Sequence, residues 1–83
     1  MKNVLVTGGA GFIGSNFINH LLSKRDDLKI INVDSLTYAG NLENLKESEK
    51  HPNYTFVKAD ITNRESINEV FTKYKIDNVI HFA

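Results

Sequence analysis

The chain has 83 residues, enough for one small domain or for part of a larger one. Hydrophobic residues make up 41% and charged residues 24%, as in globular proteins and unlike disordered segments. Ten basic and ten acidic side chains give zero formal net charge, which argues against a nucleic-acid or membrane-surface partner. There is no cysteine for a disulfide or thiolate metal site, and no apolar run reaches the roughly 20 residues of a membrane span. We expect a cytoplasmic α/β domain.

The first half of the chain alternates between strand and helix patterns. Val4–Val6 is a short apolar run typical of a buried strand, and a glycine cluster follows it. The next residues repeat with the period of an amphipathic helix, and its predicted apolar face consists of Ile13, Phe17, Ile18, Leu21 and Leu22. Leu28–Val33 is the second expected strand, with Asp34 at its carboxyl end.

The second half continues the alternation. A loop is expected over 35–40, a short polar helix over 42–49 and a strand over Tyr54–Ala59. Thr62 and Glu65 have the spacing of a capping box and predict the start of a helix. The apolar face of that helix is expected to carry Ile67, Val70, Phe71 and Tyr74, and Asn78–Phe82 is the fourth expected strand.

This order of elements predicts an α/β fold with a parallel, Rossmann-like sheet and helices on both faces. The topology of dinucleotide-binding folds gives the strand order 3-2-1-4. The fourth strand would lie at an open edge, where the chain stops, so we expect an incomplete sheet. An open apolar edge can pair with another copy, and we therefore expect the chain alone to self-associate.

The segment Thr7–Gly14 carries the first functional signal. Its glycines have the spacings Gly-x-Gly-x-x-Gly and Gly-x-x-Gly-x-x-Gly, between a predicted strand and a predicted helix. Gly8 and Gly9 allow a tight turn, Gly11 allows a pyrophosphate to approach the backbone, and Gly14 allows the helix to lie close to the sheet. A strand-to-helix turn without a ligand is the alternative, but the residues that follow favour a dinucleotide site.

Further positions complete that site. The N–H groups near Phe12 and Ile13, in the first helical turn, are expected to bind the phosphates. Asp34 follows the last glycine by twenty residues, and its carboxylate is expected to bind ribose hydroxyls and to repel a 2′-phosphate. NAD is therefore favoured over NADP, although an ordinary turn aspartate is the alternative. Asp60 and Ile61 end the third strand at the same edge, where an adenine contact and a simple helix start are equally compatible with their position.

Two other patterns do not predict chemistry. Tyr54 and Lys58 have the spacing of a helical acid/base pair, but on a strand they would lie about 13 Å apart. The three histidines lie in different predicted elements and lack metal-ligand spacing; they are His20, His51 and His81. We predict no catalytic and no metal-binding residue in this chain.

These motifs resemble a known superfamily. Thr7–Gly14 is similar to the fingerprint of the extended short-chain dehydrogenases/reductases, and Asp34–Leu42 resembles the corresponding loop of the dTDP-glucose 4,6-dehydratase family. Ala59–Ile61 and His81–Ala83 agree with both these dehydratases and the nucleotide-sugar 4-epimerases, so an epimerase remains the second interpretation. The resemblance covers all 83 residues, roughly the first quarter of such an enzyme.

The resemblance implies NAD as the cofactor and further contacts with it. Ser35, Leu36 and Thr37 would surround the adenosine ribose together with Asp34. The family often has lysine at the position of Ser35, so no charged contact is implied there. The remaining implied contacts are main-chain atoms of Phe12 and Ile13 at the pyrophosphate, Asp60 and Ile61 at adenine, and Phe82 and Ala83 beside the cofactor.

The resemblance also implies a lyase activity for the full-length enzyme. Such an enzyme oxidises C4 of a nucleotide-bound glucose through NAD, eliminates water across C5 and C6, and returns the hydride to C6, in the synthesis of deoxysugars such as rhamnose. It would be a homodimer that binds a nucleotide sugar. The catalytic residues and the substrate domain would lie beyond position 83, so we expect residues 1–83 to be the amino-terminal part of the NAD-binding domain and to be inactive alone. A stand-alone dinucleotide-binding module is the other open interpretation.

Overall fold

The computed structural model describes residues 2–8, 12–35 and 50–81. The elements in these ranges are β1 (Lys2–Thr7), α1 (Phe12–Lys24), β2 (Leu28–Asp34), β3 (Tyr54–Lys58), α3 (Arg64–Tyr74) and β4 (Asn78–His81). Neither of these two helices is long and apolar enough to cross a membrane. The helix expected over 42–49 lies outside the described residues.

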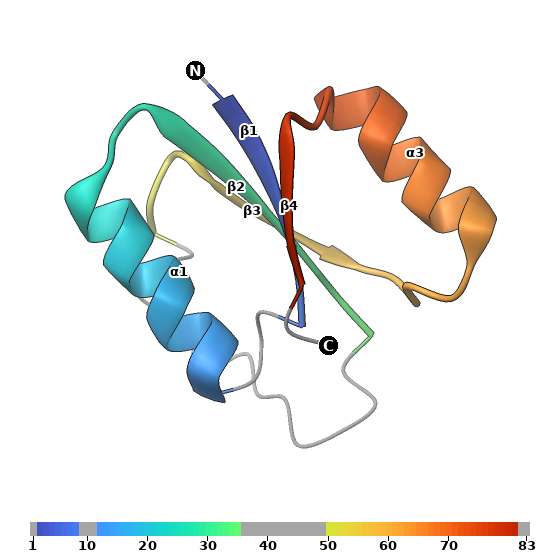
Figure 1. The fold of residues 1–83 in the computed structure, drawn as a ribbon, viewed down its shortest axis with the longest axis horizontal. Helices are drawn as coiled ribbons and strands as arrows, with labels where there is room; N and C mark the ends of the chain where they lie inside the picture. The colour runs from blue at the N-terminus through green and yellow to red at the C-terminus, as the bar shows by residue number, and fades with distance from the viewer. Residues whose placement is uncertain (1, 9–11, 36–49, 82–83) are drawn as a thin grey trace.

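The four strands form one parallel sheet in the order β3-β2-β1-β4, as predicted from the sequence. Val4 of β1 pairs with Ile30 of β2 on one side and with Asn78 of β4 on the other. Figure 1 shows α1 and α3 on opposite sides of this sheet. The observed architecture is therefore the predicted Rossmann-like one, with β3 and β4 as the edges of the described sheet.

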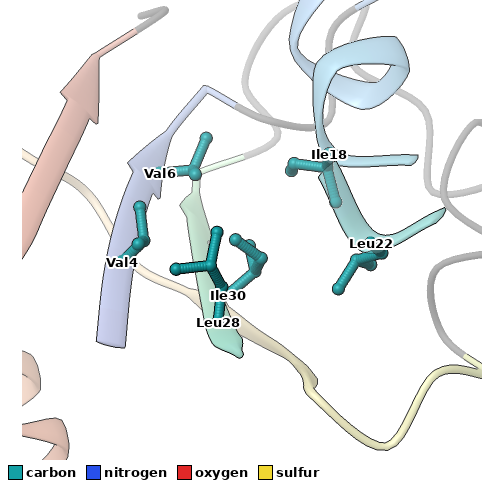
Figure 2. Close-up of a cluster of buried hydrophobic side chains, with 6 residues drawn as sticks. All are labelled: Val4, Val6, Ile18, Leu22, Leu28 and Ile30. Atoms are coloured by element: carbon teal, nitrogen blue, oxygen red, sulfur yellow. The ribbon is translucent and has the colours of Figure 1, made fainter. Parts of the chain in front are cut away.

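One core cluster lies between the sheet and α1. Its buried members are Val4, Val6, Ile18, Leu22, Leu28 and Ile30, and Figure 2 shows the side chains of α1 facing those of β1 and β2. Ile18 and Leu22 are four residues apart and so lie one above the other on the same face of the helix. At about 25 cal/mol per Å² of apolar surface removed from water, this packing is the main force that holds α1 on the sheet.

The predicted apolar face of α1 is wrong at its first residue. Ile13 is 71% exposed, whereas Gly14 and Ser15 are buried. At 100° per residue, Ile13 lies about 140° around the helix from Ile18, so both cannot face the same surface. Small residues at the beginning of α1 allow this end of the helix to approach the sheet closely.

The second core cluster lies on the opposite face of the sheet, beneath α3. Leu5, Ile31, Val33 and Val70 are its buried members. Ile67 and Tyr74 pack against them as predicted, whereas Phe71 is 39% exposed. Alternate residues of β1 and β2 thus serve two different cores, as expected for strands covered on both faces.

The predicted capping box at the start of α3 is also wrong. The N-cap is Asn63, whose side-chain oxygen accepts a hydrogen bond from the backbone N–H of Ser66 at 3.2 Å. The side chain of Thr62 instead donates to the carboxylate of Asp60. Asparagine is at least as good an N-cap as threonine, and the Thr62 side chain is directed back to Asp60 and not to the N–H groups of the helix.

At the amino end of the sheet, Asn3 forms hydrogen bonds with residues at the end of α3 and before β4. Its side-chain amide donates to the carbonyl oxygens of Tyr74 and Lys75 at the end of α3. Its backbone N–H donates to the carboxylate of Asp77 at 2.8 Å, and the N–H of Asp77 donates back to the Asn3 carbonyl at 2.8 Å. One residue of β1 therefore ties together the end of α3 and the approach to β4.

Candidate cofactor site

The carboxyl ends of the four parallel strands meet at one edge of the sheet, the lower end of the molecule in Figure 1. The chain order reverses between β1 and β4, because β2 and β3 continue to one side of β1 and β4 lies on the other. In open α/β sheets, ligands bind outside the carboxyl ends of the strands at such a switch point. The candidate site is therefore defined by topology before any side chain is considered.

Gly8 forms the turn that leaves β1 at this point. It is buried and has a φ of 73°, in the left-handed region that glycine enters without a steric penalty. Its N–H donates to the carbonyl of Val33 at 3.0 Å, which holds the turn against β2. The predicted turn role is confirmed at Gly8, while Gly9 and Gly11 lie outside the described residues.

The beginning of α1 lies just beyond the glycine segment. The first N–H groups of a helix have no partner within the helix, and the helix dipole makes this end attractive to anions. The first turn of α1 contains no acidic residue, whereas that of α3 carries Glu65 behind its Asn63 cap. Gly14 is buried, as the close approach of helix and sheet requires. The start of α1 thus suits a phosphate group, and the start of α3 is capped by its own residues.

Asp34 ends β2 next to the glycine turn. It is only 2% exposed, and the preceding residue is the one that accepts the hydrogen bond from Gly8. Its carbonyl oxygen accepts a hydrogen bond from the N–H of Ala59 at 3.2 Å, which extends the pairing of β2 with β3. Ser35 follows at an intermediate exposure, and Leu36 and Thr37 lie outside the described residues. The acidic residue and the glycine turn are therefore on adjacent strands at the same edge, as the fingerprint requires.

Asp60 has a local structural role. One of its carboxylate oxygens accepts hydrogen bonds from the backbone N–H and the hydroxyl of Thr62, at 2.8 and 2.7 Å. These two bonds stabilise the charged form and lower the pKa of Asp60, with the hydroxyl contributing most. Ile61 is half-buried against the core beneath α3. The described contacts of both residues belong to the turn before α3, and their adenine contact stays a prediction.

One contact at this edge was not predicted from the sequence. Thr7 and His81 end β1 and β4 and are register partners across the switch point. The Thr7 hydroxyl and the Nδ1 atom of His81 are within hydrogen-bonding distance, and Thr7 is 5% exposed. The available signal was their position at the ends of the two strands that flank the switch point. Phe82 and Ala83, the predicted cofactor contacts that follow, lie outside the described residues.

The structure places Tyr54 and Lys58 on a strand, as expected, and not on a helix. Tyr54 and Lys58 lie at opposite ends of β3, and the Tyr54 hydroxyl accepts a hydrogen bond from the buried side chain of Asn32 at 3.1 Å. Among the described residues, no group of three or more histidine, aspartate or glutamate side chains could hold a metal ion.

Comparison with known proteins assigns the chain to a family. The family model described as GDP-mannose 4,6 dehydratase matches residues 5–83. The chain belongs to this family. A dTDP-glucose 4,6-dehydratase of Neisseria gonorrhoeae is 48% identical over 82 residues, covering 99% of this chain and 23% of that protein. A probable dTDP-glucose 4,6-dehydratase of Sinorhizobium fredii is 52% identical over 80 residues, covering 96% and 22%.

Solved structures of a dehydratase and of an epimerase share the fold of this chain. The dTDP-glucose 4,6-dehydratase of Bacillus anthracis in complex with NAD has a TM-score of 0.95 at 49% identity, over 100% of this chain and 27% of that one. The UDP-glucose 4-epimerase of Thermotoga maritima has a TM-score of 0.81 at 36% identity, over 98% and 24%. The chain therefore spans about a quarter of the length of these relatives and corresponds to the amino-terminal region of the dehydratases.

Proposed function

We propose that the chain forms the pyrophosphate- and ribose-binding part of the NAD site of a dTDP-glucose 4,6-dehydratase. The observation that carries this proposal is the left-handed turn at Gly8, hydrogen-bonded to Val33 and hence adjacent to the buried Asp34. The turn and the acidic residue are the two halves of a dinucleotide fingerprint. NAD in the solved Bacillus anthracis dehydratase supports the choice of cofactor.

The described residues fit the cofactor in chemical terms. The glycine turn offers a backbone approach without a Cβ, and the beginning of α1, with no acidic residue, offers N–H donors to the pyrophosphate. The carboxylate of Asp34 accepts hydrogen bonds from the ribose hydroxyls, and its negative charge disfavours the 2′-phosphate of NADP. The further proposed contacts are Gly11, Ser35, Leu36, Thr37, Asp60, Ile61, Phe82 and Ala83.

In this proposal the chain binds and orients the cofactor, and the reaction is completed elsewhere. When bound, NAD would supply a reversible hydride acceptor for the sugar. The residues of this chain hold the adenosine half and exclude NADP. The chain alone is proposed to be inactive, and the whole dehydratase to be a cytoplasmic homodimer that binds the nucleotide sugar.

A nucleotide-sugar 4-epimerase is the second candidate, because epimerases share the fold of this chain. The UDP-glucose 4-epimerase of Thermotoga maritima and the UDP-Glc/GlcNAc 4-epimerase of Campylobacter jejuni have TM-scores of 0.81 and 0.87. Their identities are 36% and 28%, compared with 48% and 52% for the two dehydratases described above. The higher identity favours the dehydratase.

The test is a calorimetric titration of the 83-residue chain with NAD and with NADP. We expect NAD to bind more tightly, and Asp34→Ala to weaken NAD binding by about 10-fold or more, since a hydrogen bond to a charged group contributes about 1.5–3 kcal/mol. Asp26→Ala, an exposed aspartate in the turn after α1, is the matched control and should bind NAD as the unaltered chain does. A folded chain that binds no NAD, or that prefers NADP, would contradict the proposal.

A further inference from the structure

The two strands that flank the switch point are joined by a side-chain contact as well as by their backbones. Thr7 and His81 are opposite each other in the register of β1 and β4. Their hydroxyl and Nδ1 atoms are within hydrogen-bonding distance, at the end of the sheet where β1 passes into the Gly8 turn. The contact therefore lies directly beside the place where the cofactor is proposed to cross the sheet.

The hydrogen bond between Thr7 and His81 has a defined donor and acceptor if His81 is neutral. A threonine hydroxyl can donate to a neutral imidazole nitrogen, and the ring proton then resides on the other nitrogen, Nε2. The β-branched side chain of Thr7 has few allowed rotamers, so a hydrogen bond to its oxygen also restrains the backbone at the end of β1. The next peptide enters the left-handed conformation of Gly8, which depends on that backbone direction.

Stability alone gives little reason for such a contact. Backbone pairing already holds β4 beside β1, so the single hydrogen bond between the buried Thr7 and the exposed His81 adds only about 1 kcal/mol to the free energy of folding. A restraint on the direction of the strand end is worth more at a binding site, because displacing a phosphate-binding backbone by a fraction of an ångström weakens several hydrogen bonds together.

We propose that Thr7 and His81 are a positioning pair for the NAD site. His81 acts through Thr7: it fixes the hydroxyl of Thr7 and thereby the direction in which the glycine turn leaves β1. This inference rests on the proposed NAD site and adds two residues to it that do not themselves contact the cofactor.

The experiment compares four variants of the 83-residue chain with the unaltered chain: Thr7→Val, Thr7→Ser, His81→Phe and the double variant Thr7→Val/His81→Phe. NAD affinity is measured by calorimetry, and the exchange rate of the Gly8 amide proton by NMR. Thr7→Val and His81→Phe should each weaken NAD binding and accelerate Gly8 exchange by about 5- to 10-fold, as expected for one hydrogen bond. Thr7→Ser should stay within about twofold, and the double variant should be no worse than either single one.

The ring proton of His81 provides an independent readout. Nitrogen chemical shifts of the unaltered chain should show His81 with its proton on Nε2, and Thr7→Val should change this pattern. His51 is an internal reference, because its Nδ1 accepts a hydrogen bond from the N–H of Asn53 at 3.1 Å and its proton is therefore on Nε2. His20→Phe, on the exposed side of α1, should leave NAD binding unchanged.

The outcomes separate the two proposals. If the folded, unaltered chain binds no NAD, both the proposed function and the positioning pair are overturned. If it binds NAD and folded Thr7→Val binds equally well with unchanged Gly8 exchange, only the positioning pair is overturned. Strictly additive effects in the double variant would also overturn it, because residues that act through one contact cannot lose it twice.

Discussion

The two ends of the parallel sheet carry polar residues for different purposes. At the amino end, Asn3, Lys75 and Asp77 satisfy one another through hydrogen bonds between β1 and the connection from α3 to β4. At the carboxyl end, the Gly8 turn is hydrogen-bonded to β2 beside the buried Asp34, and the next described element along the chain is α1, whose first N–H groups favour an anion. The same strands thus close the fold at one end and form the candidate site at the other.

Stability and cofactor binding therefore depend on different ends of the sheet. Contacts at the amino end join residues more than 70 positions apart, so removing them should loosen the whole fold. Substitutions at the carboxyl end should lower the affinity for the cofactor as well as the stability of the fold. Among the described residues, each end contains one with a positive φ, Lys75 at 51° and Gly8 at 73°, and this allows a matched test.

The largest effect on stability is expected from Asn3→Leu. Leucine has a similar size but cannot donate to the carbonyl oxygens of Tyr74 and Lys75, and the part-buried carbonyl of Tyr74 then loses its partner. We expect a loss of about 2 kcal/mol in the free energy of unfolding, measured by urea denaturation. NAD affinity of the folded protein should be unchanged; a selective loss of NAD binding would contradict the division between the two ends.

Gly8→Ala should cost somewhat less stability but should also affect the cofactor. A side chain at a φ of 73° costs about 1–2 kcal/mol, and the buried turn has to distort to accommodate it. Urea denaturation and NAD calorimetry on the same variant should both show a loss. Unchanged stability would mean that the turn does not need its left-handed conformation.

Lys75→Gly is the counterpart at the amino end and should have the opposite sign. Lys75 is exposed and ends α3 in the left-handed conformation, with its N–H bonded to the carbonyl of Phe71 at 3.1 Å. Glycine adopts this conformation without a penalty and is the preferred residue after a helix. Relief of about 1–2 kcal/mol of left-handed strain outweighs the roughly 0.5–1 kcal/mol that glycine costs by raising the entropy of the unfolded chain. We expect a net gain of about 0.5–1 kcal/mol in unfolding free energy, with no change in NAD affinity; destabilisation would contradict the role assigned to the backbone at this position.

The smallest effect concerns Asp60, a residue of the carboxyl end whose described contacts are local. Its lowered pKa favours the folded state above the ordinary aspartate value of about 4, and this contribution is lost as the pH falls through the lower, folded-state pKa. Thr62→Val removes the hydroxyl that contributes most to the shift, so NMR titration should show the pKa of Asp60 moving up toward its ordinary value. Thr62→Ser keeps the hydroxyl and is the control; an unchanged pKa in Thr62→Val would contradict this assignment.

Much of the fold follows from local patterns in the sequence. The apolar runs and the change of period after the glycine cluster predicted the strands and both described helices, and the chain order predicted the arrangement β3-β2-β1-β4. These signals are local because period 2 and period 3.6 are properties of consecutive residues. The position of Asp34 at the end of β2 was predictable for the same reason.

The N-cap of α3 and the rotation of α1 about its own axis could not be predicted from local patterns. Asn63 and not Thr62 caps α3, because the Thr62 side chain is directed back to the Asp60 carboxylate. Ile13 is exposed because the orientation of α1 is set by which residues fit closest to the sheet, and the small Gly14 and Ser15 take that place. An apolar residue in a helical period predicts a face without fixing where that face begins.

The alternation of strands and helices, the glycine turn and the acidic residue that follows it are each specified by neighbouring residues, so they could be predicted from the sequence. Only the tertiary structure brought Thr7 to His81 and Asn3 to the end of α3, contacts between residues more than 70 positions apart. Such contacts depend on the register between strands, which is set by the packing of both cores at once. No short stretch of sequence contains that information.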